Sequence, residues 1–186
     1  MTGDVWYTTS WSHTTHEPTP GHEWLTNEGA SEYFLRKRPG GLDVIDAHVV
    51  DAGNRPRARW AIDWGGVGAR VRFFTEAGST WRTVDWELID GRLWRWITID
   101  WTYPDDTRIY RSSEAILDVR ASARPDGTGD FTTEDVTTGQ ESFVELTDAA
   151  KPSYWIDVPT FGDWTVLADP GPSPYEVAGR SAPAAV

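Results

Sequence analysis

The sequence predicts an all-β protein, or one nearly so: a strongly bent antiparallel sheet or a β-barrel with at most one or two short helices. Roughly eight or nine strand candidates are separated by turn signals about every eight to fifteen residues. Aromatic and β-branched residues, which favour strands, are frequent, and 12 residues are Trp. Many short strands with regular turns are typical of barrels and bent antiparallel sheets.

The first part of the chain contains several strand candidates and one ambiguous segment. Residues 27–38 suit a short helix, because Asn27 or Ser31 can cap it and Pro39 ends it, but the apolar Tyr-Phe-Leu run equally suits a strand. The glycine-rich run 65–68 is interpreted as a loop or bulge, since no Lys-Ser or Lys-Thr follows it to bind phosphate. The strands expected here are 5–10, 42–50, 57–64 and 69–75.

A hairpin between Trp81 and Asp100 is the strongest local signal. Its Asp90-Gly91 pair is typical of a type I′ turn, in which both central residues have positive φ. The two-residue loop sets the register of the arms, and with it the two faces. One face pairs Leu88 with Leu93, Trp86 with Arg95 and Val84 with Ile97; the other pairs Glu87 with Trp94, Asp85 with Trp96, Thr83 with Thr98 and Trp81 with Asp100. The first face is expected in the core, with Arg95 on Trp86, and the second is expected to line a pocket.

A third strand is expected from Arg108 to Arg120. In this strand Glu114 and Asp118 point to one side, while Leu117 and Val119 point to the other. The acidic side suits either a pocket or the solvated face of a half-exposed sheet, and the pattern alone favours neither. If it lines a pocket, Thr98, Glu114 and Asp118 converge there. The full predicted lining is Trp94, Trp96, Thr98, Tyr110, Glu114, Ile116, Asp118, Asp85 and Asp100.

The remainder of the chain is expected to complete one domain. After a turn at Pro125-Asp126-Gly127, residues 131–139 are expected to be irregular or a single helical turn, and 141–146 a strand. Short aromatic segments follow at 154–158 and 164–167. Pro, Gly, Ala and Ser dominate from Asp169 onward, which predicts a disordered tail. The predicted organisation is a barrel-like domain at 1–168 and a tail at 169–186.

Composition narrows the classes of partner. A net charge of −12 disfavours nucleic acid and anionic membranes as partners, because both repel an acidic chain. No apolar run approaches the ~18–20 residues of a membrane span, and the first residues lack the features of a signal peptide, so a cytoplasmic protein is expected. Cys is absent. Because nucleic acid and anionic membranes are disfavoured, a small-molecule substrate is the expected partner.

Two polar clusters near the N-terminus are candidates for a metal site and a phosphate site. His13, His16 and His22 include a His-x-x-His pattern that suits a metal, but their loop-like spacing favours an exposed polar loop. The basic run 36–38 is the only one in the chain, and it favours a solvated surface over a phosphate site.

One stretch resembles a known family. The run WELIDGRLWRWITIDWTYP, then AILDV, then ARPDGTGDFTTEDV resembles the nucleoside-diphosphatase family DUF402, to which the cytidylyl-phosphonate hydrolase of the fosfomycin pathway belongs. The likeness covers about 73–139. It implies a bent β-sheet or barrel and a hydrolase dependent on a divalent metal.

The family's ligand positions are only partly kept. A ligand Asn of the family corresponds to Thr98, and three alternating Asp correspond to Glu114, Ile116 and Asp118. The acidic quartet that follows corresponds to residues 132–135, of which Glu134 and Asp135 are acidic. Because Mg²⁺ and Mn²⁺ prefer several charged oxygen ligands, the resemblance implies one weak metal site on Glu114, Asp118 and Asp135, or none.

The sequence leaves three functions open. The first is hydrolysis of a phosphoanhydride or phosphoester, with the metal on Glu114 and Asp118, and with the anion held by arginines of the set Arg72, Arg95 and Arg108. The second is a metal-free enzyme of secondary metabolism, with Glu114 or Asp118 as acid or base on an organic substrate in the Trp-lined pocket. The third is a non-catalytic acidic binding protein. The hydrolase is preferred because the resemblance supports it.

Overall fold

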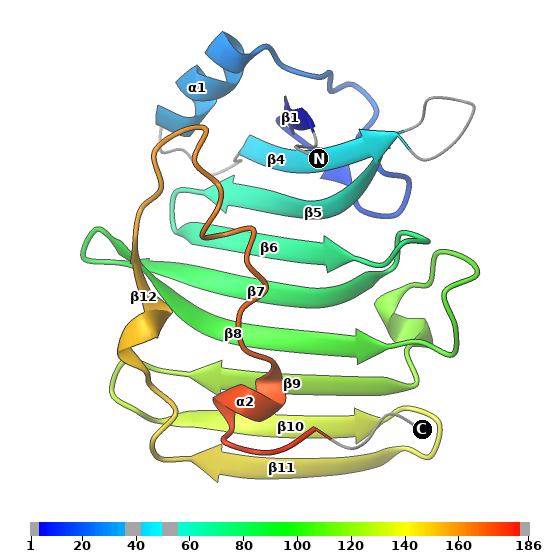
Figure 1. The fold of residues 1–186 in the computed structure, drawn as a ribbon, viewed down its shortest axis with the longest axis vertical. Coiled ribbons are helices and arrows are strands. Elements are labelled where there is room, and N and C mark those ends of the chain that lie inside the picture. Colours follow the sequence, from blue (N-terminus) through cyan, green and yellow to red (C-terminus); the bar gives the residue numbers. More distant parts are fainter. Residues whose placement is uncertain (1–3, 36–41, 50–55, 183–186) are drawn as a thin grey trace.

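A single antiparallel sheet dominates the computed structural model, which describes residues 4–35, 42–49 and 56–182. Figure 1 shows its strands stacked side by side in the order β1-β4-β5-β6-β7-β8-β9-β10-β11, with β12 pairing β8. The bounds are β1 Asp4–Thr8, β4 Leu42–Val49, β5 Pro56–Gly65, β6 Gly68–Phe74, β7 Thr80–Ile89, β8 Arg92–Thr102, β9 Leu117–Ala123, β10 Gly129–Asp135, β11 Gln140–Leu146 and β12 Trp155–Asp157.

The predicted fold class is confirmed, in its open form. Strands β1 and β11 stand at the two ends of the series, so in the described part of the chain the sheet does not close into a barrel. A separate pair, β2 (Trp11–Ser12) and β3 (Glu17–Pro18), lies beside it. The helices are α1 (Asn27–Leu35) and α2 (Pro174–Val177), and two short 3₁₀ turns are η1 (Ser112–Glu114) and η2 (Pro152–Tyr154). No helix among the described residues is long and apolar enough to cross a membrane.

The central hairpin forms where the sequence predicts it, but its register changes within the arms. Asp90 and Gly91 have φ values of 49° and 82°, and the pairs Leu88–Leu93, Trp86–Arg95 and Glu87–Trp94 are confirmed. A bulge follows: Asp85 lies opposite Ile97, and one extra residue, Trp96, is inserted in β8.

The bulge makes the predicted pairs beyond it wrong. Val84 pairs with Thr98, Thr83 with Ile99 and Arg82 with Asp100. A shift of one residue turns each later side chain to the opposite face of the sheet. Thr98 and Asp100 therefore leave the expected pocket face.

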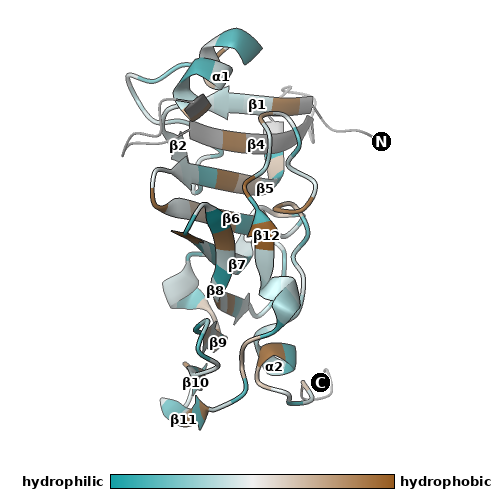
Figure 2. Cartoon of the chain, turned by 90° about the vertical axis from the view of Figure 1, so that its left-hand side faces the viewer, coloured by the Kyte–Doolittle hydropathy of each residue, from teal (hydrophilic) through white to brown (hydrophobic). Residues whose placement is uncertain are grey.

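The sheet has one covered face and one face with a pocket. The covered face carries Val71, Val84 and Ala121, and the chain from β12 to α2 runs along it (Figure 2). Trp164 and Leu167 of that segment pack into the larger core cluster, and Val177 packs with Phe131 in the second. The opposite face, called the pocket face here, carries Arg70, Arg72, Thr83, Ile99 and Trp101.

The C-terminal segment, residues 169–182, is ordered because two buried arginines bind its backbone. Arg95 donates hydrogen bonds to the carbonyl oxygens of Pro170 (2.7 Å) and Pro172 (3.1 Å). Arg82 donates to Gly171 O (3.1 Å) and forms a bidentate pair with Asp100. Burial lowers the pKa of Arg95 to about 10, so its guanidinium remains charged at neutral pH.

The predicted disordered tail is thus wrong for residues 169–182. Despite its low-complexity composition, this segment contains the capped helix α2. Ser173 Oγ accepts a hydrogen bond from Glu176 N, and the Glu176 carboxylate accepts one from Ser173 N. Residues 183–186 lie outside the described part of the chain.

Two further predicted elements are also wrong. Residues 108–116 form a loop with η1 rather than a strand, because the Glu114 carboxylate accepts from Arg111 N and so favours a local turn over sheet pairing. Residues 129–135 are strand β10, which pairs with both β9 and β11. The ambiguous segment after Asn27 is helix α1, while the basic run 36–38 lies outside the described residues.

The buried arginine anchor predicts a large loss of stability in Arg95→Ala. The variant removes the Arg95 hydrogen bonds to Pro170 O and Pro172 O, and only Pro170 O keeps a bond from Arg82 (3.4 Å), so the free energy of unfolding should fall by about 1–3 kcal/mol. The matched control is Arg92→Ala: the Arg92 side chain is 51% exposed and its Asp157 partner 91%, so its loss should cost less than about 1 kcal/mol. Urea unfolding at pH 7 measures both. Equal costs would contradict the anchor.

Candidate anion-binding pocket

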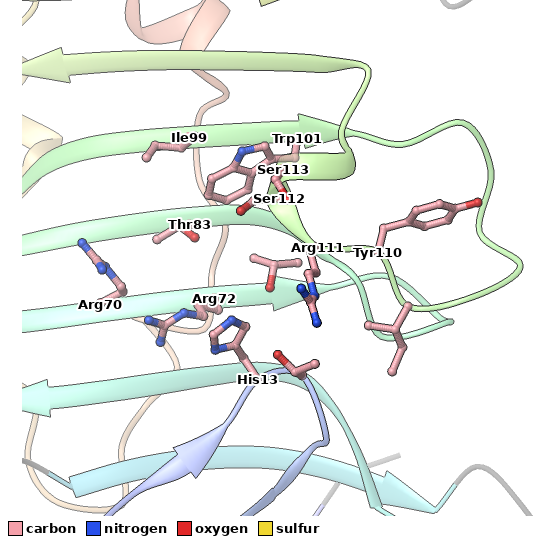
Figure 3. A pocket seen from close by; sticks show the side chains of 13 residues that line it. His13, Arg70, Arg72, Thr83, Ile99, Trp101, Tyr110, Arg111, Ser112 and Ser113 are labelled. Atoms are coloured by element: carbon pink, nitrogen blue, oxygen red, sulfur yellow. The ribbon is translucent and has the colours of Figure 1, made fainter. Parts of the chain in front are cut away.

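A cavity of about 490 Å³ lies on the pocket face, between the sheet and two loops. Strands β6, β7 and β8 form its floor, and the β2–β3 turn and the loop leading into η1 form its walls (Figure 3). Its lining residues are His13, Thr14, Arg70, Arg72, Thr80, Thr83, Ile99, Trp101, Ile109, Tyr110, Arg111, Ser112 and Ser113.

The lining is basic although the chain is acidic. Arg70, Arg72 and Arg111 contribute three guanidinium groups, and no carboxylate is among the described lining residues. Figure 3 shows Arg72 and Arg111 on either side of His13, with Arg70 beside Arg72. Five serine and threonine side chains also belong to the lining: Thr14, Thr80, Thr83, Ser112 and Ser113. Arginine and hydroxyl donors are the groups that bind phosphate and related oxyanions.

Arg70 is held in place by its neighbour in the sheet. Its Nε and Nη2 donate to both carboxylate oxygens of Asp85, each at 2.7 Å. The hydrogen bonds that Arg70 donates to Asp85 raise the pKa of Arg70, which keeps the guanidinium charged. Asp85 is thus a support of the basic lining, whereas the sequence placed it directly in the pocket.

His16 fixes the loop that carries His13 and Thr14. It is 4% exposed, its Nδ1 accepts from Ala58 N (3.2 Å), and its Nε2 bonds Gly78 O (3.0 Å). Its ring also packs edge-on against Trp11 and Phe74. The expectation of an exposed loop is therefore wrong for His16, and the buried imidazole makes the loop a firm wall.

His13 belongs to this wall, and its pKa is lower than the ordinary value of a histidine. Burial is the main cause, and the positive charge of Arg72 adds to it. The imidazole is consequently mostly neutral at pH 7, and it gains a proton only as the pH falls through this lowered pKa. The third histidine, His22, is exposed and bonds the Thr9 hydroxyl, apart from the pocket lining.

The opposite wall is held by contacts around η1. Tyr110 N donates to Ser79 Oγ at 2.9 Å, and the Tyr110 ring stacks on Tyr103. The Arg108 guanidinium lies 3.8 Å from the Tyr110 ring centroid and donates to Glu114 at 2.8 Å. Glu114 therefore positions the Arg111–Ser113 wall instead of facing a ligand, and the bond from Arg108 lowers its pKa.

The three predicted metal ligands do not come together. Asp135 accepts from the hydroxyl of Thr137 in the turn after β10, which lowers its pKa, and Glu114 belongs to η1. Asp118, on β9, accepts from Trp101 Nε1 at 2.8 Å. In the described part of the chain no three His, Asp or Glu side chains form a group suited to a metal. The residues present do not fit Mg²⁺ or Mn²⁺.

Of the predicted substrate-binding residues, Arg72 and Tyr110 line the pocket. Arg95 and Thr98 are buried on the covered face, where they bond each other at 3.2 Å. Trp94 is buried in the second core cluster and donates to Ala123 O. The Asp100 carboxylate is paired with Arg82 on the covered face.

Three other predicted residues lie at the edges of the site. Trp96 lines a separate cavity of about 340 Å³ together with Asp85 and Glu87. Arg108 packs on the Tyr110 ring and is not among the lining residues. Ile116 continues the pairing of β8, because its N–H donates to Thr102 O.

Sequence reasoning missed His13, Arg70, Arg111 and Trp101. The alternation of Arg70 and Arg72 on one side of β6 was a usable signal for two of the basic groups. His13 and Arg111 come from loops far apart in the sequence, and no local pattern brings them together.

Comparisons of the chain with protein-family models, with curated proteins and with solved structures find no match. The resemblance to the nucleoside-diphosphatase family accordingly stays a prediction.

Proposed function

We propose that the chain binds a small molecule carrying a phosphate group in the basic pocket, and that its own side chains supply the counter-charge. The observation that carries the proposal is the lining itself: three arginines and five serine or threonine side chains around one cavity, in a chain of net charge −12. The volume of about 490 Å³ lies within the range of small-molecule sites.

Arginine suits this role because its guanidinium presents several N–H donors in one plane. Two of them match two oxygens of a phosphate, which adds geometric selectivity to charge. Arg70 is pre-oriented by Asp85, and the loops that carry His13 and Arg111 are anchored by His16 and Glu114. Binding then requires little ordering of the protein, which favours affinity.

A second candidate function, hydrolysis of a phosphoester, is favoured by His13. Its lowered pKa leaves a neutral imidazole beside Arg72 at pH 7. Such a group takes a proton from water as the water oxygen bonds to phosphorus. The bond from phosphorus to the ester oxygen breaks, the leaving alkoxide takes a proton from the imidazolium or from solvent, and the arginines bind the phosphate anion. This keeps the phosphoester substrate class expected from the sequence and assigns the chemistry to other residues.

Arg72→Gln should weaken binding of inorganic phosphate and pyrophosphate by about tenfold or more, the effect expected for one lost charge-assisted hydrogen bond. The matched control is Arg120→Gln, which removes the same charge at a neighbouring position. Arg120 is exposed and pairs with Ile99 across β8 and β9, but it is not among the lining residues. Isothermal titration calorimetry at pH 7 measures both. The proposal fails if wild type binds neither anion, or if the two variants lose affinity equally.

Sulfate affinity should rise as pH falls through the lowered pKa of His13. Protonation adds a positive charge to the pocket below that pKa, while arginine in general keeps its charge at such pH values. Sulfate is the probe because its own charge is constant between pH 5 and pH 8. Titrations at stepwise lower pH, starting at pH 7.5, should show binding tightening in wild type as His13 gains its proton, and a smaller change in His13→Gln. The same pH dependence in both proteins would remove His13 from the pocket's electrostatics.

Turnover of a phosphoester such as p-nitrophenyl phosphate tests the second candidate. It should persist in EDTA, increase with pH as His13 loses its proton, and fall by about 10²-fold or more in His13→Gln. His22→Gln, at an exposed histidine outside the lining, is the control. Turnover that vanishes in EDTA, or that survives in His13→Gln, contradicts this candidate and leaves the binding proposal standing.

A further inference from the structure

Trp101 gives the basic pocket an aromatic wall. It lies on β8 and lines the cavity, and its side chain is only partly buried. Figure 3 shows the indole beside Ser112 and Ser113, across the cavity from Arg72 and His13. The other aromatic ring of the lining, that of Tyr110, is already occupied by the ring of Tyr103 and by Arg108. The indole is thus the ring that a ligand can meet.

Asp118 fixes the orientation of this indole. Trp101 and Asp118 are direct neighbours across β8 and β9, and Trp101 Nε1 donates to Asp118 Oδ2 at 2.8 Å. A half-buried carboxylate normally needs more than one donor to offset its lost hydration. Burial accordingly outweighs the indole hydrogen bond and raises the pKa of Asp118. Asp118 is outside the pocket lining, so it acts on a ligand only through Trp101.

We propose that Trp101 is a stacking platform for a flat aromatic ring attached to the bound phosphate, and that Asp118 is the residue that positions it. The proposal rests on the proposed function and names the ligand class of the same pocket: an aryl phosphate. The phosphate lies among Arg70, Arg72 and Arg111, and the ring reaches the indole from within the same cavity. Ile99, next to Trp101 on the same face, extends the apolar side of the site.

Stacking on an indole predicts a measurable selectivity. A ring–ring contact should favour phenyl phosphate over methyl phosphate by roughly three- to tenfold. Both probes carry the same anionic group, so their ratio isolates the ring contact from the basic lining. Titration calorimetry in Mg²⁺-free buffer at pH 7.5, where both phosphates are dianions, measures the two dissociation constants.

Four variants separate the platform from its positioning residue. Trp101→Leu should bring the phenyl-to-methyl preference to about one while methyl phosphate still binds. Asp118→Ala should also remove the preference, whereas Asp118→Asn, which retains an oxygen acceptor for the indole N–H, should keep most of it. The matched control is Glu134→Ala: Glu134 is the exposed partner of Asp118 across β9 and β10, and its loss should leave the preference unchanged.

Each outcome decides a separate point. Unchanged methyl phosphate affinity in a variant shows that its pocket is folded. Equal affinities of the two probes for wild type, or a preference that survives in Trp101→Leu, overturn the platform. A preference kept in Asp118→Ala, or lost equally in Asp118→Asn, overturns the positioning role. If methyl phosphate does not bind wild type at all, the proposed function itself fails, and the inference fails with it.

Discussion

The bulge between β7 and β8 decides what each face of the sheet contains. With Trp96 as the extra residue, Ile99 and Trp101 point to the pocket face, whereas Thr98 and Asp100 point to the covered face. In an unbroken ladder these pairs of residues would exchange sides. A carboxylate and a hydroxyl would then occupy the pocket, and an indole and an isoleucine would meet the C-terminal segment. The basic character of the cavity therefore depends on one inserted residue.

Arginine has a structural role on the covered face of the sheet and lines the cavity on the pocket face. On the covered face, Arg82 and Arg95 are buried and their donors are used by Asp100 and by backbone carbonyls of the C-terminal segment. On the pocket face, Arg70 and Arg72 project from β6 into an open cavity, and Arg70 still has half of its side chain exposed. Buried donors that are satisfied stabilise the fold, and guanidinium groups beside a cavity place positive charge where an anion can bind. The same residue type thus builds the structure on one side and the site on the other.

The features fixed by local chemistry were predictable from the sequence. The Asp90-Gly91 turn and the alternating arms depend on neighbouring residues, and both form; the segment after Asn27, for which the sequence left helix and strand open, is a helix. The bulge was not predictable, since nothing in the alternating arms marks Trp96 as the extra residue. The ordered tail was missed for a related reason: its anchors, Arg82 and Arg95, precede it by more than seventy residues. The candidate site was likewise predictable only where local sequence determines it. Arg72 belongs to an alternating strand and was predicted, whereas His13 and Arg111 reach the site from distant loops.

Nuclear magnetic resonance of the arginine Nε–H and tryptophan indole N–H groups during a phosphate titration tests the central claim most directly. Trp101 sits at the cavity with its N–H bonded to Asp118, and Arg72 lies on the cavity floor, so both report on occupancy. The account predicts that the Arg72 and Trp101 signals shift together along one saturable curve at pH 7. Signals of the buried Arg95 and Trp94 should stay in place. Saturable shifts confined to groups outside the cavity, or none at any phosphate concentration, would contradict it.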